Sequence, residues 1–240
     1  MSEFRAKPRI DLCTPSGSAA RSTFVELAIA LVAVAGVLVG TSHPALADVQ
    51  LWSEAGVSKR ATKRLQVELS LQTRFDQDIS RLQALLPEVG VRYRAIRWLR
   101  VGGGYRLEYE RDNNGDLVVR HRVSAYARAS YTVKRVRLDY RLMVVEQWRP
   151  SSNDQYRTVL RNRVDVSYRD LGPWTPGVSA EVFHALGDLD QADYDKLRLT
   201  AGVSLERKQH SIDVFYRAEL HADPAEPTFH ILGLGYHFDL

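Results

Sequence analysis

Charged side chains that recur at every second position are the residues of this 240-residue sequence whose spacing suggests a chemical role. Arginine dominates the set, and its planar guanidinium donates paired hydrogen bonds to carboxylates and phosphates. Aspartate and glutamate occupy similar positions, so the set predicts either a structural core of ion pairs or a cationic path for small anions. Ion pairing is the favoured interpretation. The candidate residues are Glu68, Arg92, Arg94, Arg106, Glu108, Arg120, Arg122, Asp139, Arg141, Arg161, Arg163, Asp165, Glu181, Arg198, Arg217 and Glu219.

A catalytic role needs a nucleophile beside a base, and the sequence offers few such pairs. His121 and Ser124 are the closest in sequence, but their parity differs, so a strand would point them to opposite faces. His184 and His221 have no evident serine partner. We therefore predict no catalytic residue, and an outer-membrane lipid hydrolase or acyltransferase is kept as an alternative.

No motif in the sequence predicts a cofactor or a metal ion. Strand alternation continues through Gly102–Gly104 and no helix follows, so these glycines fit close packing in a strand better than a nucleotide loop. Asp112–Asp116 begins like a calcium loop, but Val123 stands where the bidentate glutamate belongs, and an Asn-Gly hairpin turn explains the segment better. Four aspartates in one predicted loop indicate a solvated acidic loop: Asp188, Asp190, Asp193 and Asp195.

Strict alternation of apolar and polar residues defines the elements that must carry the charged side chains. It is clearest in Thr228–Leu240, where every second residue from Leu232 onward is apolar. Similar segments begin with Leu65–Phe75, and short connections between them alternate with longer polar ones such as Gln77–Pro87. These features predict an all-β fold, an antiparallel up-and-down transmembrane β-barrel of about ten strands, with twelve as the alternative.

The connection lengths also predict how the barrel is oriented and where it begins. Short turns on the side of Leu240 place the last strand on a path from outside to the periplasm. Leu65–Phe75 is then the first outgoing strand. The poorly alternating segment before it is not one of the ten predicted strands. The predicted organisation is a leader and signal peptide over 1–47, an N-terminal segment over 48–64 and the barrel domain over 65–240.

Alternation alone does not decide which face of the strands points inward. In a soluble lipocalin-like barrel the apolar set would fill the interior, whereas in a membrane barrel it would face lipid. An Arg-rich charged face, an aromatic-bearing last strand and aromatic residues near strand ends favour the membrane barrel. The aromatic residues near strand ends are Trp98, Tyr109, Tyr131, Trp148, Tyr168 and Trp174.

The N-terminus contains the parts of a secretory signal peptide. Arg21 precedes the apolar segment Leu27–Gly40, and its length of about 14 residues is below the roughly 20 that a membrane helix needs. Ala45 and Ala47 form the A-x-A cleavage site, so we predict cleavage after Ala47, with an uncleaved anchor as the alternative. The single cysteine, Cys13, lies in this leader, so the predicted mature chain can form no disulfide or thiolate site.

Charge and compartment limit the partners that the chain can have. The 33 Lys and Arg residues are nearly balanced by 29 Asp and Glu, which together with secretion argues against nucleic acid. The predicted location is the outer membrane of a Gram-negative bacterium. The predicted partners are outer-membrane lipids, the barrel-assembly machinery acting on the C-terminal strand, and a small anion or solute in the lumen.

An ordered series of short motifs resembles one bacterial family across nearly all of Trp52–Leu240. The motifs are Leu51-Trp52, Gly90–Tyr93, Gly102–Arg106, Arg161-Asn162-Arg163, Glu181–Phe183, Arg198–Gly202 and Gly235–Phe238. They resemble an uncharacterised outer-membrane β-barrel family, the domain of unknown function numbered 2490. The resemblance implies a signal peptide and a barrel, and it supplies no catalytic residues. Tyr236, Phe238 and Leu240 would form the barrel-assembly signal, although such signals usually end on Phe and this chain ends on Leu.

Overall fold

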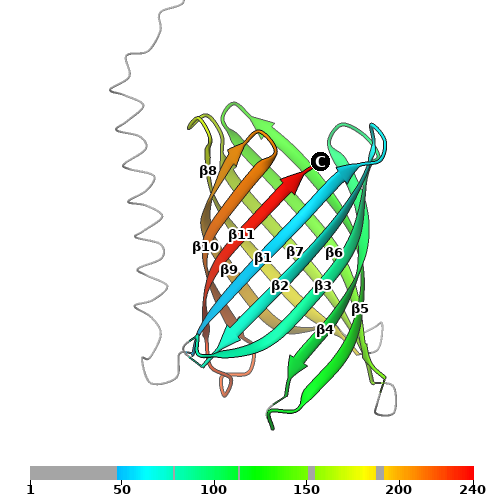
Figure 1. Cartoon of the computed structure of the whole chain (residues 1–240), viewed down its shortest axis with the longest axis vertical. Helices are drawn as coiled ribbons and strands as arrows, with labels where there is room; N and C mark the ends of the chain where they lie inside the picture. The colour runs from blue at the N-terminus through cyan, green and yellow to red at the C-terminus, as the bar shows by residue number, and fades with distance from the viewer. Residues whose placement is uncertain (1–47, 78, 113, 151–154, 188–191) are drawn as a thin grey trace, which may run out of the picture.

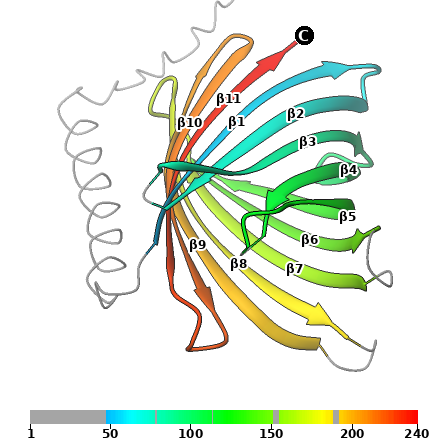
Figure 2. The same ribbon diagram turned by 60° about the horizontal axis from the view of Figure 1, so that its bottom comes forward.

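Eleven strands close into a β-barrel in the computed structural model, which describes residues 48–77, 79–112, 114–150, 155–187 and 192–240 (Figure 1). The strands are β1 (Asp48–Arg60), β2 (Leu65–Asp76), β3 (Arg81–Arg94), β4 (Leu99–Arg111), β5 (Leu117–Val133), β6 (Val136–Arg149), β7 (Gln155–Tyr168), β8 (Trp174–Leu186), β9 (Ala192–Arg207), β10 (His210–His221) and β11 (Phe229–Asp239). Turned so that its bottom comes forward, the barrel shows its tilted strands arranged around one axis (Figure 2). The predicted leader, with Ala45 and Ala47, lies outside the described residues.

Strands that follow one another in sequence pair antiparallel around the wall, and the barrel closes by a parallel pair. In that closing pair, β1 lies beside β11 with Leu51 opposite Leu232 and Val57 opposite Phe238. An odd number of alternating strands leaves the first and last pointing the same way, so their pairing must be parallel. The all-β barrel is confirmed, but the predictions of ten or twelve strands and of a wholly antiparallel wall are wrong.

The additional strand is β1, which the sequence pattern predicts to lie outside the barrel. Asp48–Arg60 pairs along its length with β2 on one side and with β11 on the other. Its alternation is weak because its outward positions include Ser53 and Ala55, and the Ser53 and Thr73 hydroxyls hydrogen bond across β1 and β2 at 2.5 Å. Its inward positions include Trp52, which is buried, so an apolar residue occurs on each face.

The β2–β3 connection is much shorter than the predicted loop over Gln77–Pro87. β3 already begins at Arg81, and Gln77 turns the chain with a left-handed φ of 49°. Ala84 and Leu86 are buried inside the barrel while Leu85 faces outward, so this part of β3 is apolar on both faces. That double-sided apolar pattern hides the alternation, and a register shift at Arg74 and Phe75 accommodates the tight connection.

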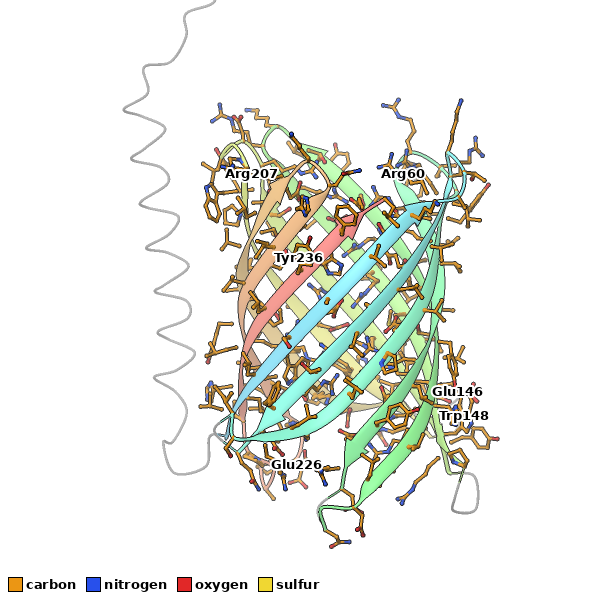
Figure 3. The ribbon with its side chains drawn as sticks, in the orientation of Figure 1. Arg60, Glu146, Trp148, Arg207, Glu226 and Tyr236 are labelled. Atoms are coloured by element: carbon orange, nitrogen blue, oxygen red, sulfur yellow. The ribbon has the colours of Figure 1, made fainter. Side chains whose placement is uncertain are left out.

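Apolar side chains cover the outside of the wall and charged side chains fill the inside. Leu69, Val214 and Tyr131 are 55%, 53% and 68% exposed, whereas Glu181 is 1% exposed. Successive strand residues point to opposite faces, so each strand contributes to both sets. In Figure 3, Trp148 projects outward from the wall near the lower rim. The barrel is therefore apolar outside and polar inside, the reverse of a soluble ligand-binding barrel.

Aromatic and histidine side chains form two belts on the outer wall. Near one rim, Tyr236 Oη and His210 Nδ1 lie 2.8 Å apart, and Phe238 packs against the same imidazole. Near the other rim, the His121 ring stacks on Trp148. The Tyr156 ring follows next to Trp148. Such belts place amphipathic rings at two levels of the wall, one close to each end of the strands.

The two rims differ in their connections and in the chain ends that they carry. The rim at the end of β11 has the two-residue connections 134–135 and 208–209, and Lys208 adopts a left-handed φ of 51°. Arg60 and Arg207 lie at this rim in Figure 3, and Glu226 lies at the opposite one. Because β1 and β11 are parallel, β1 starts at the rim of Glu226. In the described part of the chain, no helix is long and apolar enough to cross a membrane.

Candidate functional site

Three adjoining cavities occupy the barrel interior. A rim cavity of about 640 Å³ is lined by Arg60, Arg64 and Asp239, so it lies at the rim where β11 ends. A side cavity of about 610 Å³ lies along Arg137, Asp165 and Arg169, and a central cavity of about 480 Å³ lies along Trp52, Arg74 and Glu181, among other residues. Glu54 lines all three cavities, so they meet at this carboxylate.

Ion pairs within strands and between strands line the rim and side cavities. Arg92 on β3 contacts Glu68 on β2 at 2.6 Å, and Glu68 lies two positions from Gln66, the residue directly opposite Arg92. Arg137 contacts Asp139 at 2.7 Å on β6 itself. Asp165 on β7 receives Arg163 at 2.5 Å and also Arg128 from β5 at 3.6 Å. Charged side chains of the inner face therefore pair both within one strand and between strands.

A second set of pairs lines the central cavity on the side of β4 and β5. Arg122 contacts Glu108 at 3.1 Å, and Arg120 pairs with Glu110. Glu108 is 5% exposed and also accepts a hydrogen bond from the Gln147 amide at 2.5 Å. This side of the cavity is closely balanced in charge, because each guanidinium has its own carboxylate.

The opposite side of the central cavity is built by one row of residues across four strands. Arg163, Glu181, Arg198 and Glu219 face one another in succession across β7, β8, β9 and β10. Within the row, the Arg198 guanidinium donates to Glu219 at 2.5 and 2.8 Å and lies 3.6 Å from Glu181. Cross-strand register thus places alternating charges side by side inside the wall.

Further basic side chains converge on these two carboxylates. Glu181 receives Arg141 at 2.8 Å and Arg161 at 2.9 Å, and Glu219 receives Lys196 at 2.6 Å. Arg161 also lies 4.6 Å over the Phe183 ring, measured from the guanidinium carbon to the ring centre. Each of the two carboxylates therefore pairs with several cations, and these cations share their carboxylate partners.

Trp52 stands at the centre of this site with guanidinium groups around its ring. Its indole Nε1 donates to the buried Gln50 side chain at 3.0 Å, which fixes the ring orientation. The guanidinium carbons of Arg74, Arg217 and Arg198 lie 4.0, 5.2 and 5.4 Å from the ring centre. These distances are in the range of cation–π interactions.

A family model described as "Protein of unknown function (DUF2490)" matches residues 49–229 of the chain. The chain belongs to this family. The match begins one residue after the start of β1, spans β2 to β10 and ends at Phe229, the first residue of β11. The predicted family is confirmed.

Other comparisons add little to the DUF2490 assignment. No curated protein matches the chain. One solved structure, described under "Unveiling the Mechanism Behind the in-meso Crystallization of Membrane Proteins", is 12% identical with a TM-score of 0.40. The similarity covers 76% of this chain and 78% of that one. This similarity is too low to support a conclusion about the DUF2490 member described here.

The structure of this DUF2490 member places the charged residues predicted from the sequence around the cavities. Fifteen of them line the rim, side or central cavity, and Glu219 is buried beside Arg198. The site residues absent from the predicted set include Trp52, Arg74 and Lys196. Arg74 and Lys196 had a usable signal, since each shares the parity of charged neighbours in its strand. Trp52 had none, because its strand alternates weakly.

The other motifs fall at separate places in this family member. His121 lies on the outer wall against Trp148, whereas Ser124 lines the central cavity.

Gly102–Gly104 continue as part of β4. The Asp112 carboxylate accepts hydrogen bonds at 2.9 Å from the backbone amides of Asn114 and Asp116, so it closes the β4–β5 turn. Asp188 and Asp190 lie outside the described residues, and Asp195 pairs with Arg157 at 2.9 Å.

Proposed function

We propose that this protein is a bacterial outer-membrane β-barrel whose charge-lined interior is a narrow pore for small solutes. The observation that carries the proposal is the distribution of side chains, apolar outside and charged inside. Exposed leucine, valine and tyrosine over a whole wall would cost free energy in water, whereas a bilayer removes that cost. A charged interior, in turn, requires water or ion pairing.

The dimensions of the wall support a membrane location. Its strands are between 11 and 17 residues long. A tilted strand needs roughly 9–11 residues to cross the hydrocarbon core. The aromatic belts near both rims correspond to the two headgroup levels at which tyrosine and tryptophan are enriched. Outer-membrane lipids are thus the proposed partners of the outer wall.

The arrangement of cavities supports a pore over a purely structural barrel. The rim, side and central cavities share wall residues, so polar space extends from the rim at β11 into the middle of the barrel. A barrel of this size is narrow, and its side chains occupy much of the lumen. The proposed passage is therefore selective by size and charge and does not resemble a wide general pore.

The route to the membrane is part of the same proposal. A signal peptide cleaved after Ala47 would deliver the chain to the periplasm, where the assembly machinery would act on β11 through Tyr236, Phe238 and Leu240. The short connections at the rim of Leu240 support a periplasmic position for that rim. No enzymatic activity is proposed, because His121 and Ser124 face opposite sides of the wall.

Two measurements test the proposal. Membrane fractionation with heat-modifiable gel mobility should recover the protein as a folded barrel in the outer membrane, and recovery as a soluble periplasmic protein would overturn the membrane assignment. The purified protein in planar bilayers should give small, stepwise currents. A folded, inserted protein that carries no current would overturn the pore, and altered envelope lipids in a deletion strain would favour the lipid-modifying alternative.

A further inference from the structure

The central cavity contains more positive than negative charge. Its lining includes eleven basic side chains and six acidic ones. The excess is concentrated around Trp52 in a group that we call the central cationic cluster. The central cationic cluster consists of Arg74, Arg141, Arg161, Lys196, Arg198 and Arg217, and its carboxylates are Glu181 and Glu219. Two carboxylates cannot neutralise six cations.

Arg74 and Arg217 account for most of this imbalance. Arg74 donates a hydrogen bond to the neutral Gln72 amide at 3.2 Å, and Arg217 donates to the Thr200 hydroxyl at 3.0 Å. Within the part of the chain that the structure describes, neither has a carboxylate oxygen within 4.0 Å, whereas Arg198 has two such partners. An enclosed cation without a counter-charge costs free energy, so this pair favours an anion from outside the chain.

The Arg74 guanidinium also has an unused hydrogen-bond donor. Its Nε is buried and has no partner within the described part of the protein. The group is nonetheless held in place, because it lies 4.0 Å over the Trp52 ring and is anchored through Gln72. A positioned guanidinium with free donors is the arrangement that binds planar or tetrahedral oxyanions.

Aromatic rings restrict the space in which such an anion could lie. Trp52, Phe183 and Phe215 line the central cavity together with Arg74 and Arg217. The Arg217 guanidinium carbon lies 4.6 Å from the Phe215 ring centre and 5.2 Å from that of Trp52. Apolar rings beside the cations exclude water from one side, which strengthens the attraction between a cation and a bound anion.

We infer that Arg74 and Arg217 form, beside Trp52, a binding site in the lumen for a small oxyanion with a carboxylate or phosphate group. The inference rests on the proposed function, because a pore gives such an anion access to the central cavity. It also sets the selectivity of that pore: anions pass through a site that attracts them, and small cations meet the excess positive charge of the cluster. The site lies in the central cavity, which meets the rim cavity at Glu54, so an anion that enters from that rim reaches it.

Trp52 provides a direct reporter of the site. Of the four tryptophans, Trp98 and Trp174 are exposed at strand ends and Trp148 stacks on the outer wall, so Trp52 is the one inside the barrel. A full-length variant with Trp98→Phe, Trp148→Phe and Trp174→Phe, in detergent micelles, isolates its fluorescence. Titration with inorganic phosphate, and separately with succinate, should give a saturable change, and iodide should quench this fluorescence more than caesium does.

Substitution of the two unpaired arginines tests the assignment of the site. Arg74→Gln and Arg217→Gln should each weaken phosphate binding by about tenfold or more, the effect expected from losing one charge-assisted hydrogen bond. Arg92→Gln is the matched control, because it removes one positive charge from the rim cavity, where Arg92 pairs with Glu68. Heat-modifiable mobility of each variant shows that the barrel is folded before binding is compared.

The outcomes separate the site from the pore. Saturable phosphate binding that both arginine variants weaken supports the site, even if planar bilayers show no current and the pore fails. Currents without saturable phosphate or succinate binding, or binding unaffected by Arg74→Gln and Arg217→Gln, would overturn the site and leave the pore standing. If succinate binds and phosphate does not, the ligand class narrows to carboxylates, and the reverse result narrows it to phosphates.

Discussion

Glu181 is the carboxylate on which the central ion pairs converge. Arg141 and Arg161 both reach it within 3 Å, and it is almost completely buried. Replacing it with glutamine keeps the shape of the side chain and removes the charge, so Arg141 and Arg161 lose the counter-ion that they share. The same exchange makes the central cavity more positive. This single residue therefore affects both the stability of the wall and the net charge of the central cavity.

We predict that Glu181→Gln lowers the free energy of unfolding by about 3 kcal/mol, as when one partner of a buried ion pair is removed. Urea unfolding in lipid vesicles, followed by gel mobility, measures the change. The control is Glu206→Gln, an exposed carboxylate at the rim end of β9. Equal losses for both substitutions would show that Glu181 has no special role in neutralising the cluster.

Gly102 is required by the close approach of β3 and β5 around it. A Cβ at this position would lie 2.5 Å from the Val91 carbonyl oxygen and 2.6 Å from the Tyr126 hydroxyl. We predict that Gly102→Ala destabilises the barrel by about 2 kcal/mol, because the backbone of β3 must move to accommodate it. The change is measured by urea unfolding. Gly187→Ala is the control, since nothing lies within 4 Å of a Cβ there, and a loss as large as that of Gly102→Ala would contradict the packing argument.

At the scale of the elements, the outer face of β11 distinguishes a membrane barrel from a soluble one. Leu234 is 50% exposed near the middle of that strand. In a bilayer, Leu234→Arg should cost about 3 kcal/mol, the typical penalty for a charged side chain near the midplane. In water the same substitution would be close to neutral. Unfolding in vesicles of this variant, with Leu234→Val as the control, measures the difference.

The β1–β11 pair is the element-level feature that the sequence predicts least well. Cysteine substitutions test it, since the predicted mature chain contains none. The pair Leu51→Cys with Leu232→Cys joins residues that lie directly opposite each other, so oxidation should form a cross-link that shifts gel mobility. The pair Leu51→Cys with Leu234→Cys is two positions out of register and should not cross-link. The opposite pattern would mean that the barrel closes in another register.

Strand identity could be predicted where each face of a strand is uniform in character. In β11 and β10 the outward residues are mostly apolar and the inward residues are small or polar apart from Ile231 and Phe215, so alternation is visible in the sequence. It fails in β1 and β3, because Trp52 and Leu86 are apolar yet point inward. Tertiary packing inside the lumen decides those positions, and a single strand contains no signal for it.

The candidate site was predictable in composition but not in connectivity. Alternation identifies Glu181 and Arg198 as residues of the polar face. Their pairing depends on the register between β8 and β9, and a one-residue shift of that register would separate them. The role of Trp52 depends on Arg74 and Arg217 reaching it from β2 and β10, strands that flank the β1–β11 pair and that only the closed barrel brings together.

At the scale of the whole molecule, the two rims should face different compartments. With the rim of Leu240 in the periplasm, the 222–228 connection lies outside the cell. A peptide epitope inserted after Asp223 should therefore be accessible to antibody on intact cells, whereas one inserted at Lys208 should be detected only after permeabilisation. Labelling of the Lys208 epitope on intact cells would reverse the orientation without changing the barrel.

The parallel pairing of β1 with β11 also restricts how the order of strands could be rearranged. In a barrel with an even number of strands, both chain ends meet at one rim, and a short peptide can join them to make a circular permutant. Here the end of β11 lies opposite Ser58, so it is separated from the start of β1 at Asp48 by about 33 Å along the strand at 3.3 Å per residue. A linker would have to run along the apolar outer wall or thread the lumen. Gain or loss of one strand at the β1–β11 pair would return both ends to one rim.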